Sequence, residues 1–485
     1  MRNIAAGMQK KVWQIRPASR DAAKLAQSLN ISPLVAQILI NRQLDQTEPA
    51  RAFLSPKLSD LIAPEQMFGI SEAAACIRQA IESRKKISIY GDYDVDGITS
   101  VAILWHLLQM LGAQVDYYIP HRIDEGYGLN SDAVRRLAAG GTELLITVDC
   151  GITAVEPVRL AREMGIQTLI TDHHQPGAVL PDAAAIVHPR LDPAYGNPHS
   201  AGAMVAFKLA WAVANAYKKG VQLSAPLRQY LLNATTLAGI GTIADVVDLR
   251  GENRVLAGYG LKALEASNLV GIRTLVQTAE LYAADVNSYA VAFRLAPMLN
   301  AAGRMGHARL AVELLTTESE VRAIQIAQYL KDQNRLRQKY QLDIFKQARQ
   351  RIVQMGLHHP DRKTIVLADE NWHTGVIGIV AARIVDDFYR PTILINTGEG
   401  IGQGSGRSIE GFNLHAHLEA CSDYLISFGG HEMAAGLRIE PSRIAAFAEA
   451  FEASAEQAFR EKMPASCLTI DAEVRIADFT ERLMK

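Results

Sequence analysis

The chain has 485 residues, too many for one hydrophobic core, and at roughly 100–200 residues per domain we expect two or three domains. Its formal net charge of −1 excludes a protein that coats nucleic acid by overall charge, so any nucleic-acid site must be a local basic groove. Four cysteines without a Cys-x-x-Cys pair favour neither a zinc ribbon nor a disulfide framework and fit a cytoplasmic location, and the lack of any run of about 18 apolar residues predicts no membrane span.

The first half of the chain predicts peripheral helices followed by a parallel sheet. Helices are expected within residues 18–80, and the pattern changes at Lys85. Four short apolar strands then alternate with three helices. The strands are 86–91, 114–119, 144–148 and 167–170, and the helices are 98–111, 131–139 and 154–164. This alternation predicts a parallel sheet covered on both faces, with ligands at the carboxyl ends of its strands.

The second half predicts a helical region and then a second α/β domain. Residues 201–345 are largely helical in pattern, and 316–355 lacks proline and predicts one or two long helices. From Lys363 strands and helices alternate again. The expected elements are a strand at 364–368, a helix at 374–387, a strand at 390–395 and a glycine-rich stretch at 398–407.

Acidic and histidine residues follow the predicted strands of the first sheet. Each set would emerge at the same edge of that sheet. Asp245 lies in the helical region that could fold over this edge, although it could also be a helix cap. The residues at the strand ends are Asp94, Asp96, Asp149, His173 and His174.

Carboxylates that converge without lysines repel one another, and a bound dication relieves the repulsion. Oxygen and imidazole ligands together suit Mn²⁺, with Mg²⁺ as an alternative, and zinc is less favoured without thiolates. A carboxylate that bridges two ions is the arrangement used in two-metal phosphoryl chemistry. The sequence therefore predicts two divalent ions and hydrolysis of a phosphoester.

Long motifs around these residues resemble the DHH phosphoesterase superfamily. The matching stretches, in chain order, are Tyr90-Gly-Asp-Tyr-Asp-Val-Asp-Gly97, Val148-Asp-Cys-Gly151, Asp172-His-His174 and Gly241-Thr-Ile-Ala-Asp-Val-Val247. Gly404-Ser-Gly-Arg-Ser408 and Phe428-Gly-Gly-His431 resemble the DHHA1 domain that accompanies the DHH core. The resemblance covers about residues 65–440 and is greatest to the superfamily's nucleases specific for single-stranded DNA.

The resemblance implies a role for each matching residue. Asp149 would bridge the two ions and Asp94 would bind one of them, while Asp96, His173 and Asp245 would bind the other. Further residues would bind the substrate. These are His174 at the scissile phosphate, Arg122 and Arg304 on the DHH side, and Ser405, Arg407 and His431 on the DHHA1 side. Arg122, Ser405 and Arg407 would form the pocket for a terminal 5′ phosphate.

With the resemblance, the expected fold is α/β: a parallel-sheet DHH domain and a smaller α/β DHHA1 domain joined by one or two long helices. An incomplete C-terminal OB-fold is expected from the strand-like segment 467–479, with an exposed edge strand near residue 470 and weaker DNA affinity. The predicted domains are 1–69 (helical extension), 70–315 (DHH), 316–354 (helical linker), 355–460 (DHHA1) and 461–485 (start of the OB-fold).

One residue departs from part of the superfamily. Tyr90 stands where the pyrophosphatase branch has a metal-binding histidine, which argues against a pyrophosphatase. Asp92 could compensate for the missing ligand or bind only through water.

The resemblance implies a 5′–3′ exonuclease on single-stranded DNA that releases mononucleotides in repair and recombination. Its partners would be a single strand with a 5′ end, and a single-strand-binding protein and a helicase as collaborators. Two alternatives stay open: an oligoribonuclease or nucleotide phosphatase on short substrates, and an inactive scaffold that holds single strands.

Overall fold

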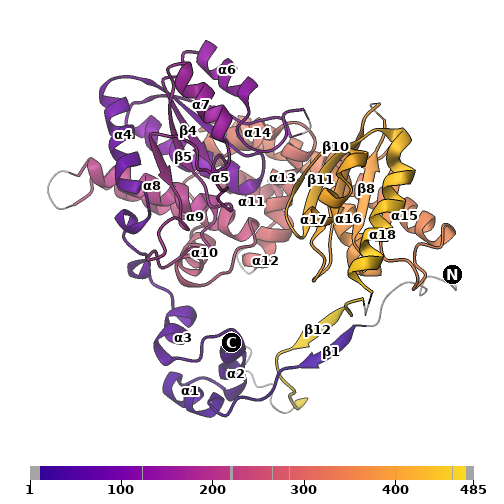
Figure 1. Cartoon of the computed structure of the whole chain (residues 1–485). Coiled ribbons are helices and arrows are strands. Elements are labelled where there is room, and N and C mark those ends of the chain that lie inside the picture. Colours follow the sequence, from indigo (N-terminus) through magenta and orange to yellow (C-terminus); the bar gives the residue numbers. More distant parts are fainter. Residues whose placement is uncertain are drawn as a thin grey trace. The chain divides into compact units, whose positions relative to one another are not determined.

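The computed structural model describes residues 11–122, 124–218, 222–264, 266–282, 285–398, 400–460 and 463–476 (Figure 1). Contacts divide the chain into two compact units. The central unit comprises residues 51–335, and the terminal unit comprises residues 1–50 together with 336–485. The limits of the five domains expected from the sequence stay a prediction.

A five-stranded parallel sheet forms the centre of the central unit, in the order β3-β2-β4-β5-β6. Its register aligns Ile89 of β2 with Ile146 of β4. The four predicted strands and the parallel arrangement are confirmed, whereas β6 was not predicted because it is only three residues long. The strands are β2 (Lys86–Gly91), β3 (Gln114–Tyr118), β4 (Leu144–Val148), β5 (Gln167–Thr171) and β6 (Ala185–Val187).

Successive residues of these strands pack on opposite faces of the sheet. Ile89 and Ile146 join the large core with α4 (Ile70–Glu82), α5 (Val95–Met110) and α8 (Gly202–Ala216). Tyr90, Leu145 and Ile170 join a smaller core on the other face, under α6 (Ser131–Ala139) and α7 (Val155–Glu163). Helices thus cover both faces, and the carboxyl ends of the strands stay available for a site.

The remainder of the central unit is helical, as predicted. Helix α9 packs against α5, α8 and α10 and carries Asp245 at its C-terminal end. The elements are η1 (Leu58–Asp60), η2 (Pro64–Gln66), α9 (Ala225–Ala244), α10 (Gly251–Leu264), α11 (Val270–Thr278), α12 (Ser288–Ala290), the π-helix η4 (Val291–Leu295), α13 (Ala296–Arg304) and α14 (Ala308–Thr316).

One long helix, α15 (Glu320–Gln354), continues from the central unit into the terminal unit. The sequence left one or two helices open, and the structure has one because no glycine or proline interrupts the segment. Its first turns bury Ile326 and Leu330 in the core of the central unit. Its last turns bury Ile344 and Ile352 in a core of the terminal unit.

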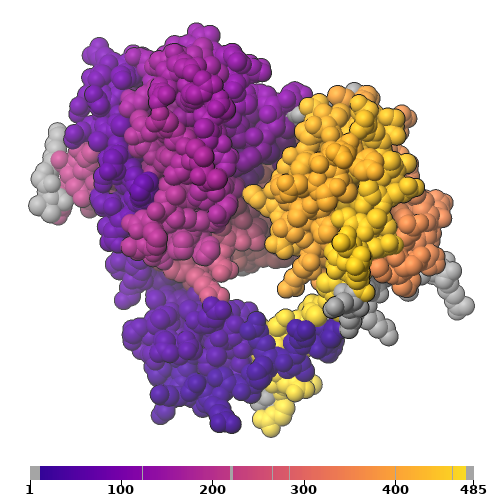
Figure 2. Space-filling view, in the orientation of Figure 1, coloured from indigo at the N-terminus to yellow at the C-terminus, as the bar shows by residue number. Residues whose placement is uncertain are grey.

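The terminal unit contains a mixed five-stranded sheet in the order β10-β11-β9-β8-β7. Only β7 and β8 run parallel; the other neighbours are antiparallel. In Figure 2 the orange and yellow segments that carry this sheet form one continuous body. The elements are β7 (Ile365–Asp369), α16 (Thr374–Phe388), β8 (Thr392–Asn396), β9 (Gly402–Arg407), α17 (Leu414–Ala420), η5 (Ser422–Tyr424), β10 (Leu425–Gly430), β11 (Ala434–Ile439), η6 (Pro441–Arg443) and α18 (Ile444–Ala458).

The glycine-rich stretch expected at 398–407 is largely strand β9. Glycine lowers strand propensity, so the sequence pattern did not indicate a strand there. In the structure Gly404 lies against Leu437 of β11, where a Cβ would come within 2.7 Å of the leucine side chain. Leu437 on the neighbouring strand therefore fills the space that a side chain at position 404 would need.

A small sheet pairs the two ends of the described chain. β1 (Val12–Ile15) runs parallel to β12 (Cys467–Ile470), and Leu468 on β12 is half exposed. β1 was not predicted, and the OB-fold stays a prediction because residues 477–485 lie outside the described residues.

The N-terminal helices are α1 (Ala22–Leu29), α2 (Pro33–Asn41) and α3 (Thr47–Leu54). Across the described residues, every helix is too short or too polar to cross a bilayer.

Candidate active site

The turn between β2 and α5 places two of the predicted aspartates. Asp94 is the N-cap of α5, and its side chain accepts a hydrogen bond from Gly97 N at 3.1 Å. Asp96 lies in the first turn of α5, is 1% exposed and accepts hydrogen bonds from Gly202 N at 2.5 Å and Ala203 N at 2.8 Å. The N-terminus of α8 therefore holds the carboxylate of Asp96 in one orientation.

Asp149 follows β4 in a strained backbone conformation. Its φ is +60°, its N–H donates to Thr171 O at 3.0 Å, and the residue is 2% exposed. A left-handed conformation costs a residue with a Cβ about 1–3 kcal/mol. Gly202 lies so close that a Cβ there would be 2.6 Å from Asp149 Oδ1. Backbone strain and close packing thus fix this carboxylate, and strain of this kind is common at functional sites.

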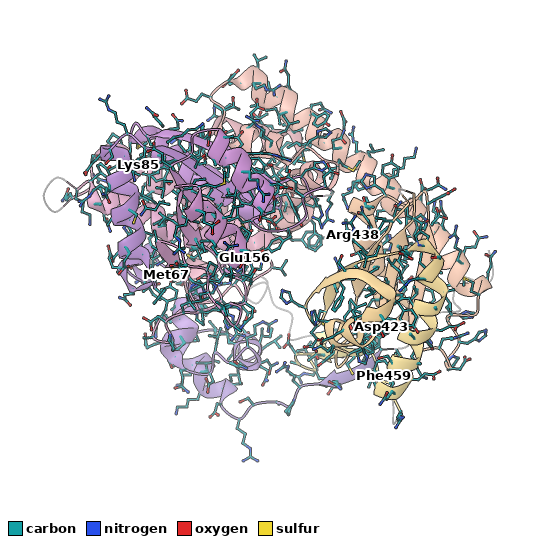
Figure 3. The ribbon with its side chains drawn as sticks, turned by 45° about the horizontal axis from the view of Figure 1, so that its top comes forward. Met67, Lys85, Glu156, Asp423, Arg438 and Phe459 are labelled. Carbon is teal, nitrogen blue, oxygen red and sulfur yellow. The ribbon has the colours of Figure 1, made fainter. Side chains whose placement is uncertain are left out.

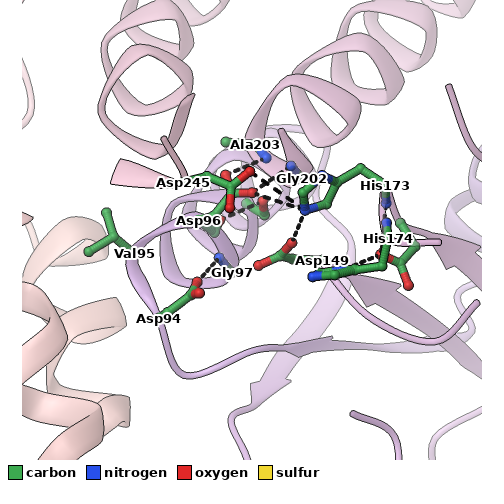
Figure 4. A network of polar contacts seen from close by, with 12 residues as sticks. Asp94, Val95, Asp96, Gly97, Asp149, His173, His174, Gly202, Ala203 and Asp245 are labelled. Atoms are coloured by element: carbon green, nitrogen blue, oxygen red, sulfur yellow. Dashed lines mark hydrogen bonds and ion pairs between the residues drawn. The ribbon is translucent and has the colours of Figure 1, made fainter. Parts of the chain in front are cut away.

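His173 reaches the carboxylates from the end of β5 (Figure 4). Its Nε2 lies 3.1 Å from Asp149 Oδ1 and 3.8 Å from both Asp96 Oδ2 and Asp245 Oδ2. The contact between His173 Nε2 and Asp149 Oδ1 does not have hydrogen-bond geometry. Among the described residues, these two atoms and Asp92 Oδ1 are buried without a hydrogen-bond partner. Buried polar atoms without partners cost about 1–3 kcal/mol each, so they indicate a ligand at this position.

Three overlapping sets of these residues have the spacing needed to hold a cation. Within each set the ligand atoms lie within 4.8 Å of one another. The sets are Asp96, His173 and Asp245; Asp92, Asp94 and Asp149; and Asp149, His173 and His174. The structure thus brings together all five residues that the sequence analysis assigned to metal ions, and it adds Asp92.

Burial and mutual repulsion shift the pKa values of this cluster. Burial, with the charge of Asp94 second, raises the pKa of Asp96 to about 7. Burial, with the charges of Asp96 and Asp94, raises the pKa of Asp245 to about 8. Burial is also the main reason why the pKa values of Asp149 and Asp92 are raised. Burial lowers the pKa of His173 to about 3, so its imidazole is neutral and able to bind a cation.

His174 has a different partner from His173. Its Nδ1 lies 2.7 Å from Asp172 Oδ1. Burial opposes ionisation of Asp172, but the hydrogen bonds from His174 and Ile152 N lower its pKa to about 2. An ionised carboxylate only accepts hydrogen bonds, so Nδ1 of His174 carries the proton, and Nε2 lies 3.3 Å from the hydroxyl of Tyr127.

Arg122 and Arg304 lie beside the acidic turn. The guanidinium of Arg122 is 4.6 Å from the ring centroid of Tyr93, which stands between Asp92 and Asp94 in the sequence. Burial raises the pKa of Tyr93 to about 12, and both arginines act against that rise. Two positive charges thus lie close to the cluster, at partly exposed positions.

Ser405, Arg407 and His431 belong to the terminal unit. Arg407 Nη1 donates to Ser405 Oγ at 3.2 Å, and both residues lie on β9. His431 is exposed in the turn between β10 and β11, and its N–H donates to Ala434 O at 2.8 Å. Ala434 is the register partner of Arg407, so the turn with His431 lies at the Arg407 end of β9.

Three residues of the site carried no assigned role in the sequence analysis. Asp172 orients His174, and its place in the Asp-His-His motif was a usable signal. Gly202 donates its N–H to Asp96, and its lack of a Cβ leaves space for the Asp149 side chain. Nothing in the sequence around Gly202 indicates either role. Asn300 of α13 accepts a hydrogen bond from Val95 N at 3.2 Å, and only the tertiary structure brings the two together.

Comparisons with known proteins agree with this architecture. The model of the DHH family, N-terminal domain, matches residues 86–237, and that of the DHHA1 domain matches residues 361–457. The single-stranded-DNA-specific exonuclease RecJ of Bacillus subtilis is 45% identical over 432 residues, which cover 88% of this chain and 53% of that protein. The chain therefore spans about half the length of this relative.

Two further relatives are similar over most of this chain. RecJ of Haemophilus influenzae is 33% identical over 94% of this chain and 80% of its own length. The crystal structure of RecJ in complex with Mn²⁺ from Thermus thermophilus matches with a TM-score of 0.80 and 32% identity, covering 94% of this chain and 64% of that one.

Proposed function

Because the chain belongs to the RecJ family, with DHH and DHHA1 domains, we propose that it is a metal-dependent exonuclease for single-stranded DNA. It would remove mononucleotides in the 5′–3′ direction by hydrolysis of phosphodiester bonds. The relatives are named as single-stranded-DNA-specific exonucleases, and the Thermus thermophilus structure contains Mn²⁺.

The buried atoms without hydrogen bonds, Asp149 Oδ1 and His173 Nε2, carry this proposal. A set of carboxylate oxygens and neutral imidazole nitrogens fits Mn²⁺, and Mg²⁺ as an alternative. Asp94 and Asp149 would hold one ion. Asp149 would also hold the second, together with Asp96, His173 and Asp245. Bound ions would supply an activated water molecule and neutralise the charge of the phosphate.

The protein's own residues would orient the strand. His174, held through Nδ1 by Asp172, would in its protonated form donate from Nε2 toward the scissile phosphate. Arg122 and Arg304 would bind phosphates beside the cluster, since a guanidinium fork suits a phosphate. Ser405, Arg407 and His431 would bind phosphates from the terminal unit. Of these, Ser405 and Arg407 would hold the terminal 5′ phosphate together with Arg122.

The biological setting is part of the same proposal. A single strand with a 5′ end arises during DNA repair and recombination in the cytoplasm of a bacterium. A helicase would expose that strand and a single-strand-binding protein would cover it, so both are proposed as collaborators. Equal binding and degradation of a strand with and without these two proteins would contradict the collaboration.

Digestion of end-labelled DNA tests the proposal. The chain is incubated with 5′- or 3′-labelled single strands of about 20 nucleotides and the matching duplex, with Mn²⁺, Mg²⁺ or EDTA. We expect early release of the 5′ label, resistance of the duplex, and no reaction in EDTA. Preference for dinucleotides would favour an enzyme for short substrates. Binding without cleavage under every condition would favour an inactive scaffold.

A further inference from the structure

Tyr127 contacts the two parts of the site that the proposed reaction uses. Its hydroxyl lies 3.0 Å from Nδ1 and 3.3 Å from Nε2 of His174, and it donates to the backbone oxygen of Asp149 at 3.3 Å. The two rings meet edge to face with centroids 5.4 Å apart. One side chain therefore links the imidazole of His174 to the strained backbone of Asp149.

Exposure separates Tyr127 from a core tyrosine. Tyr127 is 52% exposed, whereas Tyr90 on β2 is fully buried. Because half of the residue faces solvent, packing alone does not fix the position of Tyr127. The contacts of its hydroxyl and ring edge, and the conformation of its loop, must therefore hold it against His174.

A buried tyrosine, Tyr90, and a partly exposed one, Tyr118, brace that loop. Tyr90 OH donates to Gly128 O at 2.8 Å, directly after Tyr127. The ring of Tyr90 stacks on Tyr118 with centroids 5.5 Å apart and an interplanar angle of 9°. Tyr118 OH in turn donates to Glu125 Oε2 at 2.7 Å, and Glu125 Oε1 accepts from His121 N at 3.1 Å. Both sides of the loop around Tyr127 are thus tied to the sheet.

We propose that Tyr127 is a positioning residue that holds the His174 ring over Asp149, and that Tyr90 braces its loop. This inference rests on the proposed nuclease function. It gives the departure at Tyr90 a physical meaning: its side chain lies in the core under α6 and α7, and its hydroxyl holds the loop of Tyr127. The Tyr127 hydroxyl donates its own proton to Asp149 O, so its oxygen accepts a share of the Nδ1–H of His174. This contact is a second restraint besides Asp172, because one hydrogen bond at Nδ1 leaves the ring free to tilt.

The test is steady-state kinetics on a 5′-phosphorylated single strand with Mn²⁺. Tyr127→Phe keeps the ring and removes the hydroxyl, so kcat should fall about three- to tenfold, the range for one neutral hydrogen bond, with KM changed by less than about twofold. Tyr90→Phe keeps the stacking and removes the bond to Gly128, and kcat should fall less. Tyr282→Phe is the matched control, because Tyr282 is 72% exposed and remote in sequence, and it should leave both constants unchanged.

A double-mutant cycle distinguishes positioning from a general structural role. In a His174→Ala background, Tyr127→Phe should lower kcat by a smaller factor than in the wild type, because only the contact with Asp149 O is then lost, and the Mn²⁺-induced rise in Tm should match that of the wild type. An equal loss in both backgrounds, or a Tyr127→Phe enzyme with wild-type kcat, would overturn the inference while the nuclease function stands. A wild-type chain that degrades no single strand under any metal condition would overturn the proposed function itself.

Discussion

The acidic cluster of the central unit and the β9–β11 region of the terminal unit are built in opposite ways. Asp96 and Asp149 are 1% and 2% exposed, and backbone N–H groups and a strained φ fix them before any ligand arrives. Arg407 is partly exposed at the end of β9, the central strand of its sheet, and His431 is exposed in a turn. A rigid, buried set suits chemistry, whereas longer and more exposed side chains suit recognition of a strand. The two regions should therefore respond differently to substitution.

Asp149→Asn should give the largest effect. Asparagine keeps the side-chain volume and tolerates the left-handed backbone, so the fold should persist. Removing the charge should lower kcat by roughly 10³-fold or more, since this carboxylate belongs to two of the ligand sets. Nuclease assays and thermal unfolding on the same samples check both statements. Asp248→Asn is the control, because that carboxylate is 74% exposed. Activity near wild type in Asp149→Asn would refute the metal assignment.

Metal removal should reveal how the buried carboxylates oppose folding. The folded pKa values of about 7 for Asp96 and about 8 for Asp245 lie above the unfolded value of about 3.9. The two carboxyl groups contribute their full stabilisation of the folded state below pH ~4, and this contribution is lost as pH rises through 7 and 8. The protein in EDTA should thus lose Tm between pH 6 and 8.5, and Mn²⁺ should raise Tm more at pH 8.5. A Tm in EDTA that rises over this range would contradict the shifts.

The sequence predicted much of the first region and less of the second. Strands β2 and β4 are continuous apolar runs, and parallel strands must end at one edge, so the meeting of Asp94, Asp149 and His173 followed from pattern alone. The strained φ of Asp149 and the N–H groups of Gly202 and Ala203 could not be predicted, because they depend on how α8 packs against the sheet.

In the terminal unit, the sequence pattern did not identify strand β9. β9 is half glycine, so its pattern resembles a loop, and only its pairing with β8 and β11 makes it a strand. Ser405 and Arg407 were therefore identified by resemblance, without the geometry that explains them.

Arg407→Ala should have an intermediate effect confined to binding of the strand end. Loss of a charge-assisted contact to phosphate should raise KM for 5′-phosphorylated strands about 10- to 100-fold and leave 5′-hydroxyl strands nearly unchanged. Competition between the two substrates measures the preference. Arg438→Ala is the matched control, since Arg438 is exposed on the neighbouring strand β11 (Figure 3). Retention of the 5′-phosphate preference in Arg407→Ala would show that another group binds the end.

Gly378→Ala should give the smallest effect and the finest test of the difference between the regions. A Cβ on this residue of α16 would lie 2.8 Å from Ser405 Oγ and 3.1 Å from Arg407 Nη2. Both are ends of flexible side chains, so they can shift, and the helix gains about 0.8–1 kcal/mol from replacing glycine. Stability should therefore hold or rise while the 5′-phosphate preference falls about two- to threefold.

Gly258→Ala on α10 separates the gain in helix stability from the change in 5′-phosphate preference. Its Cβ would meet only Pro56 Cγ at 3.9 Å, so the variant should gain stability without any change in preference. An unchanged preference in Gly378→Ala as well would mean that Ser405 and Arg407 adjust freely and that their resting positions do not set end recognition. A reduced preference with undiminished Tm would mean that recognition depends on where these side chains rest, although they lie outside the rigid cluster.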